Sequence, residues 1–122
     1  MPRKRILVKS IDTSISYQVI GIDLAKHLVS ACLITGAGEI FGIDRLTYDD
    51  LLKSAERMSP TLFCMEPCPE VHYLAEKLQG YGHHTKVIDG AAVKEYIKTH
   101  FGGQKTDLND AQAIAFLSLD TN

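Results

Sequence analysis

The chain has little cysteine, no long apolar run and almost no net charge, and each shortage excludes a class of protein. Its three cysteines, Cys32, Cys64 and Cys68, are an odd number without the paired spacing of a zinc site. A disulfide framework and a structural zinc centre are therefore both excluded as the basis of the fold. With 122 residues, the chain has enough length for one hydrophobic core and not for two.

Long hydrophobic runs are missing although 45% of the residues are hydrophobic. The apolar stretches are far shorter than the roughly 20 residues that cross a bilayer. The first eight residues carry positive charges with no apolar segment or cleavage site behind them, so they do not resemble a secretory signal. We therefore expect a cytoplasmic protein with no membrane partner.

The formal net charge of −2 does not favour nucleic-acid binding through phosphate neutralisation by side chains alone. Bound divalent cations would change this, because they add positive charge that a count of side chains does not show. Nucleic acid therefore stays open as a partner if carboxylates of the chain hold metal.

Hydrophobic periodicity divides the chain into a short arm and one α/β domain. Residues 1–16 have weak periodicity, and we expect a flexible or partly ordered N-terminal arm. The predicted strands are residues 17–23, 27–34, 39–43, 61–66 and 84–88, and the predicted helices are residues 47–58, 67–82, 91–99 and about 105–119. This order predicts an α/β fold with a mixed five-stranded sheet, an antiparallel meander and flanking helices.

Four acids adjoin apolar segments. Asp23 ends the first predicted strand beside Gly21, which permits another backbone to come close, and Glu66 ends the fourth. Taken alone, each acid is explained as an exposed strand end or as an acid near a helix start. Asp107 and Asp110 lie three residues apart at the start of the last predicted helix, where they can cap the helix or present two carboxylates to a cation.

These four acids together favour a shared site, because strand ends and a helix start can meet at one edge of a mixed sheet. Carboxylates that converge would repel one another unless a divalent cation lay between them. Ligation by oxygen alone favours magnesium or manganese over zinc. Two such ions, about 3.5–4 Å apart, would assist attack on a phosphodiester.

Three motifs in series resemble the DEDD transposases of bacterial insertion sequences, the group that includes the Piv-type DNA invertases. The motifs are IGIDLAK at residues 20–26, MEPCPEVHYL at residues 65–74 and QKTDLNDAQAI at residues 104–114. The resemblance implies a RuvC-like catalytic domain with a ribonuclease H-like fold over residues 17–122. It also implies that the catalytic, metal-binding tetrad of that family corresponds to Asp23, Glu66, Asp107 and Asp110.

The same resemblance implies metal-dependent cleavage and strand transfer of DNA, with Mg²⁺ or Mn²⁺ as cofactor. It implies DNA as a partner, a guide RNA in some members, and assembly as a homo-oligomer. Lys26 and Lys105 lie within three residues of a tetrad acid and are candidates for contacts with phosphate, or are simply solvated.

Members of that family carry a further C-terminal domain with a serine implicated in strand chemistry, which these 122 residues do not include. We therefore expect the chain not to complete transposition alone. Two alternatives stay open. One is a non-catalytic nucleic-acid-binding or dimerisation remnant, and the other is a nucleotide-binding ATPase domain with a ribonuclease H-like core.

Overall fold

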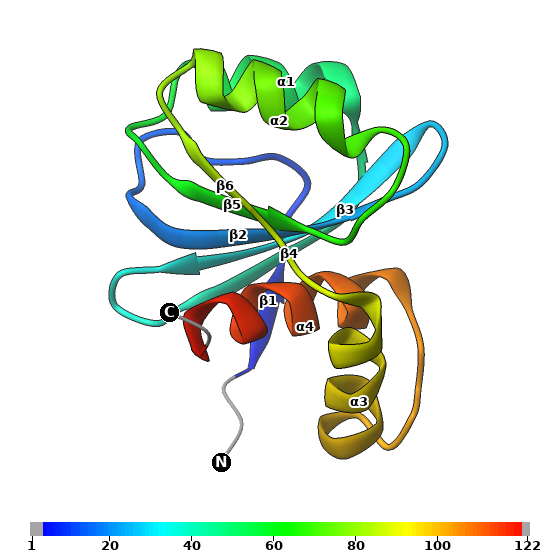
Figure 1. Cartoon of the computed structure of the whole chain (residues 1–122). Helices are drawn as coiled ribbons and strands as arrows, with labels where there is room; N and C mark the ends of the chain where they lie inside the picture. The colour runs from blue at the N-terminus through cyan, green and yellow to red at the C-terminus, as the bar shows by residue number, and fades with distance from the viewer. Residues whose placement is uncertain (1–3, 121–122) are drawn as a thin grey trace.

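A six-stranded mixed sheet separates two layers of helices (Figure 1). The computed structural model describes residues 4–120. The strands are β1 (Arg5–Leu7), β2 (Tyr17–Leu24), β3 (Leu28–Thr35), β4 (Ile40–Thr47), β5 (Leu62–Met65) and β6 (His84–Val87). The helices are α1 (Tyr48–Glu56), α2 (Val71–Gly80), α3 (Gly90–His100) and α4 (Asp107–Asp120). Across the sheet the strand order is β1-β4-β3-β2-β5-β6.

The predicted antiparallel meander and mixed sheet are confirmed. Strand β3 pairs antiparallel with β2 and β4, whereas β5 pairs parallel with both β2 and β6. The parallel half follows from the alternation of helices and strands in the second part of the chain, because a helical crossover returns the chain to the same end of the sheet. Strand β2 therefore joins the antiparallel half to the parallel half. This mixed α/β architecture is consistent with a ribonuclease H-like fold.

The sheet has one strand more than the five predicted. Residues 5–7, inside the predicted N-terminal arm, form β1 and pair in parallel with residues 40–42 of β4. A three-residue strand is too short to show a period in the sequence, and its side chains are half-buried or exposed. Residues 1–3 of the predicted arm lie outside the described residues.

Helix α2 begins at Val71, four residues later than the predicted start at Pro67. A proline disfavours the helical conformation in the residue before it, so Pro69 keeps its predecessor out of the helix. The result is a loop over residues 66–70 that directly follows β5. Glu66 therefore lies at a strand end and not in a helix.

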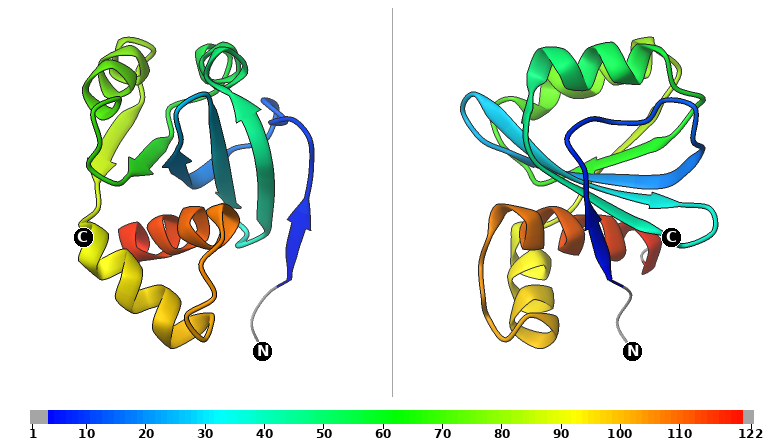
Figure 2. Two further views of the ribbon diagram at one scale, coloured as in Figure 1. Left: turned by 90° about the vertical axis from the view of Figure 1, so that its right-hand side faces the viewer. Right: turned by 180° about the vertical axis from the view of Figure 1, so that it is seen from behind.

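Helices cover both faces of the sheet (Figure 2), and each face carries its own hydrophobic core. Successive side chains of a strand point to opposite faces, and β5 shows this directly. Phe63 and Met65 pack in the core under α1 and α2, whereas Cys64 packs in the core shared with α3 and α4. None of the helices within residues 4–120 has the length and apolarity needed to span a membrane.

Helix α4 lies very close to β2 at Gly21, as the glycine beside Asp23 suggested. A Cβ atom at Gly21 would lie 2.3 Å from the carbonyl oxygen of Ala111 and 2.6 Å from the amide nitrogen of Ala115. Only a residue without a side chain permits this approach. Gly21 therefore helps to fix the position of α4, and with it the two acids at the start of α4, relative to the end of β2.

Candidate metal centre

The register of the sheet brings the strand-end acids Asp23 and Glu66 next to one another. Ile22 pairs with Met65 in the parallel β2–β5 register, so the residues that follow on the two strands are these two acids. Neighbouring strands lie about 4.8 Å apart. Both acids therefore lie at the carboxyl ends of β2 and β5, where open α/β sheets bind their ligands.

Thr106 caps helix α4, and Asp107 does not. The Thr106 hydroxyl accepts a hydrogen bond from the Asn109 amide at 3.0 Å, and its carbonyl oxygen accepts one from the Asp110 amide at 2.9 Å. The capping role that the sequence allowed for the two acids is therefore filled by Thr106. Both carboxylates are left for other contacts, although Asp107 is exposed and Asp110 is only 3% exposed.

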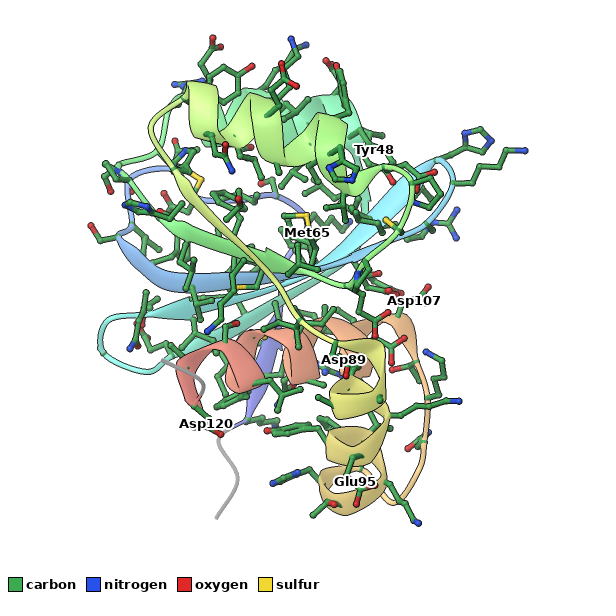
Figure 3. All side chains as sticks on the ribbon, in the orientation of Figure 1. Tyr48, Met65, Asp89, Glu95, Asp107 and Asp120 are labelled. Carbon is green, nitrogen blue, oxygen red and sulfur yellow. The ribbon has the colours of Figure 1, made fainter. Side chains whose placement is uncertain are left out.

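Three of the four predicted acids meet in space. Carboxylate oxygens of Asp23, Asp107 and Asp110 all lie within 4.8 Å of one another, and we call these three residues the acidic cluster. Within residues 4–120, Glu66 is not a member of this cluster, although the charge of Asp110 contributes to a raised pKa of its carboxyl group. Figure 3 shows Asp107 at the start of α4 and Asp120 at the opposite end of the helix.

Lys105 brings a positive charge to the acidic cluster. Its Nζ donates a hydrogen bond to Oδ2 of Asp110, which joins a largely exposed ammonium group to a buried carboxylate. The hydrogen bond with Asp110 raises the pKa of Lys105. The second lysine predicted to contact nucleic acid, Lys26, lies in the exposed turn between β2 and β3.

The other carboxylate oxygen of Asp110 is an unusual feature of the cluster. Oδ1 is buried and has no hydrogen-bond partner among the residues that the structure describes. A buried acceptor without a partner costs free energy, and the cost is larger for a charged group. A cation is the kind of partner that this oxygen lacks.

Burial and mutual repulsion raise the pKa values of two of the acids. The pKa of Asp23 rises from 3.8 to about 7, because the side chain is partly buried, faces the charge of Asp110 and shares a hydrogen bond with Asp107. Burial, followed by the charge of Asp110, also raises the pKa of Glu66. The Lys105 ammonium lowers both pKa values but only in part. The carboxylates therefore repel one another in the metal-free chain.

In the presence of a chelator, we expect the free energy of unfolding to fall as the pH rises from about 4 to about 7. The folded chain keeps a proton on Asp23 up to a pH of about 7, whereas the unfolded carboxyl loses its proton near 3.8. The folded state thus binds more protons within this window, so its stability decreases as the pH rises. The raised pKa of Glu66 acts in the same direction.

Urea unfolding of the wild type at a pH of about 5 and of about 8 measures this dependence. The variant Asp23→Asn is the control, and its stability should change less between the two pH values because residue 23 no longer titrates. Greater stability of the wild type at the higher pH would contradict the expectation.

The donors present fit a hard divalent cation. Asp23, Asp107 and Asp110 offer carboxylate oxygens only, which magnesium and manganese prefer. The partnerless Oδ1 of Asp110 adds an acceptor that a cation would satisfy. Zinc would favour cysteine or histidine ligands, and the described residues of the cluster include neither.

A cavity of about 180 Å³ opens beside the acidic cluster. Asp23 and Asp107 line it together with Ser30, Asp44 and Arg45 of β3 and β4, three residues that the sequence analysis did not single out. A larger cavity of about 460 Å³ lies between the sheet, α3 and α4, and its described lining is mostly apolar and aromatic, without a carboxylate. Of these two cavities, the smaller one adjoins the acidic cluster and is lined by its carboxylates, so it belongs to the candidate site.

Comparisons with known proteins agree with the motifs from which the four acids were predicted. A family model of the DEDD transposases of the IS110 type, described as "Transposase", matches residues 20–122. All four predicted acids fall inside this match. The structure and the family match thus concern the same part of the chain.

Three transposases are similar to the chain over about 95 residues. The chain is 29% identical over 98 residues to the transposase for insertion sequence element IS1111A of Coxiella burnetii, an alignment that covers 80% of the chain and 26% of that protein. It is 28% identical over 96 residues to the transposase for IS1328 of Yersinia enterocolitica, covering 79% and 28%. It is 27% identical over 95 residues to the putative transposase y4pF/y4sB of Sinorhizobium fredii, covering 78% and 24%. The aligned part of the chain spans about a quarter of the length of these relatives.

Proposed function

Because the chain belongs to the DEDD transposase family whose model matches residues 20–122, we propose that it forms the part of a transposase that holds divalent metal for DNA cleavage and strand transfer. One observation carries the proposal. Carboxylate oxygens from the end of β2 and the start of α4 lie within 4.8 Å of one another, and one oxygen of Asp110 is buried without a partner. Such a cluster has little structural use without a cation.

In this proposal, Asp23, Asp107 and Asp110 hold Mg²⁺ or Mn²⁺, and Glu66 completes the tetrad from the neighbouring strand end. A divalent cation bound there supplies Lewis-acid assistance to the attacking and leaving oxygens of a phosphodiester. The chain contributes orientation, because burial fixes the Asp110 side chain and the strand register fixes the positions of the two strand-end acids. Metal binding would also release the proton that Asp23 holds at a pH below about 7.

Lys105 has two roles in the proposal. In the metal-free chain its ammonium group neutralises Asp110, and it therefore competes with a divalent cation for the same carboxylate. Once displaced, the exposed ammonium group would be free to contact a phosphate oxygen of DNA. Lys26, in the turn that follows β2, would provide a second such contact.

DNA is the proposed substrate, and the further partners implied by the family resemblance are a guide RNA and other copies of the chain. The two alternative functions are not favoured. The family match is to transposases and not to nucleotide-binding ATPases. A non-catalytic remnant would have no need to keep three carboxylate oxygens so close together.

Calorimetric titration with manganese chloride tests the proposed metal site. For Lys105→Ala, the proposal predicts the direction in which the Mn²⁺ affinity changes. We expect the wild type to bind Mn²⁺ and the variant to bind it several-fold more tightly, because the competing ammonium group is gone. The same variant should bind duplex DNA more weakly, because one phosphate contact is lost.

The control for this experiment is Lys98→Ala, which removes an exposed lysine from the last turn of α3. It should leave Mn²⁺ binding unchanged. Absence of heat with the wild type, or weaker Mn²⁺ binding by Lys105→Ala, would contradict the proposed site. Incubation of the wild type with branched and linear DNA in Mn²⁺ then separates cleavage from binding.

A further inference from the structure

A β-bulge places Arg45 on the wall of the small cavity beside the acidic cluster. The register of β3 and β4 shifts between Val29 and Ala31, so that Ser30 faces both Asp44 and Arg45. In a regular strand two successive side chains would point to opposite faces. Asp44 and Arg45 are instead both exposed and line the same cavity. Bulges redirect side chains in this way and are frequent next to active sites.

Arg45 lies in the cross-strand row that begins at Asp23. Asp23 pairs with Ser30 in the β2–β3 register, and the Ser30 hydroxyl donates a hydrogen bond to the carbonyl oxygen of Asp44 at 2.7 Å. Two strand spacings of about 4.8 Å separate the backbones of β2 and β4 by about 10 Å. Asp23 and Asp107 of the acidic cluster line the cavity of about 180 Å³ together with Arg45.

The guanidinium group of Arg45 is available to a ligand. Arg45 is exposed, and its side chain forms no ion pair or hydrogen bond with the rest of residues 4–120. It is also the only cation among the described residues that line this cavity. A guanidinium group presents five N–H donors in a planar fork that matches phosphate oxygens.

We propose that Arg45 binds a backbone phosphate of the DNA strand close to the phosphodiester that is cut. The inference rests on the proposed function, because it requires DNA at the acidic cluster. The acids would hold the metal at the phosphodiester that is cut, whereas Arg45 belongs to β4, two strands away from Asp23, so the phosphate that Arg45 binds is a neighbour of that phosphodiester on the same strand. Arg45 is thus a positioning residue that fixes where the strand crosses the site.

Asp44 explains why the ligand is a phosphate of a polymer and not a free anion. Its carboxylate lines the same cavity, as do those of Asp23 and Asp107. These charges repel a small anion from a cavity with a single cation. A strand held at other points, over a metal-neutralised cluster, can bring a phosphate to Arg45 against this repulsion.

The salt dependence of DNA binding tests this inference. Fluorescence anisotropy should measure binding of a labelled duplex to the wild type, Arg45→Ala and Arg45→Lys. The salt concentration is varied, and calcium chloride is present throughout as the divalent cation. We expect Arg45→Ala to reduce the slope of log K against log salt by about 1 and to weaken binding at low salt by about fivefold. Arg45→Lys should restore the slope and only part of the affinity, because lysine keeps the positive charge but lacks the planar fork of N–H donors of a guanidinium group.

Arg57→Ala is the matched control, because Arg57 is an exposed arginine that follows α1 on the opposite face of the sheet. Its salt slope should equal that of the wild type. A wild-type slope for Arg45→Ala, or failure of the wild type to bind the duplex at low salt, would overturn the inference. The Mn²⁺ titration is a separate readout. Arg45→Ala should keep the wild-type Mn²⁺ affinity, whereas absence of Mn²⁺ binding by the wild type would count against the proposed metal site.

Discussion

Replacing Asp110 with asparagine should abolish the stabilisation of the chain by divalent metal while the metal-free chain stays folded. Asp110 is 3% exposed, and its Oδ1 is the buried oxygen without a partner. Asparagine keeps the shape of the side chain and removes the charge. The variant loses the ion pair with Lys105, but that ammonium group is largely exposed, so the pair contributes little.

The metal-free variant should unfold at the temperature of the wild type or above it. The charge of Asp110 is one cause of the raised pKa values of Asp23 and Glu66, so its removal relieves repulsion inside the cluster. Both pKa values should then move back toward those of ordinary carboxyl groups. A flatter dependence of stability on pH should accompany this change.

Thermal unfolding with and without manganese chloride separates the two effects. A ligand at a hundredfold excess over its dissociation constant stabilises a fold by about 2.7 kcal/mol, and this increment should appear in the wild type and disappear in Asp110→Asn. Cleavage of DNA by the variant should fall by at least about a hundredfold, because even groups that only orient metal ligands contribute 10- to 100-fold.

Asp120→Asn is the matched control for Asp110→Asn. It makes the same substitution on the same helix, at the end far from the acidic cluster, as Figure 3 shows. The control should keep the metal-induced rise in unfolding temperature. If Asp110→Asn showed that rise as well, the acidic cluster would not be the metal site.

The four acids were predicted from their combination, because each local pattern taken alone also has a structural explanation. An acid at the end of an apolar strand is visible as a break in composition, and the i, i+3 spacing of Asp107 and Asp110 places both on one side of a helix. The close approach of α4 to β2 then brings three of the four acids together, and the β2–β5 register places Glu66 at the neighbouring strand end. Their use as metal ligands stays a prediction.

Features that depend on pairing between distant segments could not be predicted. The strand β1 has three residues, and only its partner β4 defines it. The bulge that turns Arg45 toward the cavity is a property of the β3–β4 register and leaves no signature in the composition of β4. The cap of α4 could have been predicted, because Thr106 is a preferred capping residue that precedes the two acids.

Replacing Gly21 with alanine should destabilise the chain by about 3 kcal/mol or more. The added Cβ atom would lie 2.3 Å from the carbonyl oxygen of Ala111 and 2.6 Å from the amide nitrogen of Ala115, and both are backbone atoms that no rotamer change can move away. Overpacking of a core typically costs about 1–3 kcal/mol, and a clash with backbone requires a shift of the whole helix. Urea unfolding in a chelator measures the loss.

Gly80→Ala is the matched control, because no atom beyond its chain neighbours and the backbone of its own helix lies within 4 Å of the position that its Cβ would take. Gly80 is the last residue of α2, so alanine there should be neutral or should stabilise the chain by up to about 1 kcal/mol. A neutral Gly21→Ala would show that α4 can move away from β2 without cost.

The Mn²⁺ affinity of folded Gly21→Ala gives a second readout, which connects the packing of α4 to the metal site. Helix α4 carries Asp107 and Asp110, whereas β2 carries Asp23, so any separation of the two elements lengthens the distances inside the acidic cluster. Mn²⁺ affinity should therefore fall in Gly21→Ala even under conditions in which the variant is fully folded, and it should be unchanged in Gly80→Ala. Wild-type affinity in a folded Gly21→Ala would mean that the cluster tolerates displacement, and that the close contact at Gly21 contributes to stability alone.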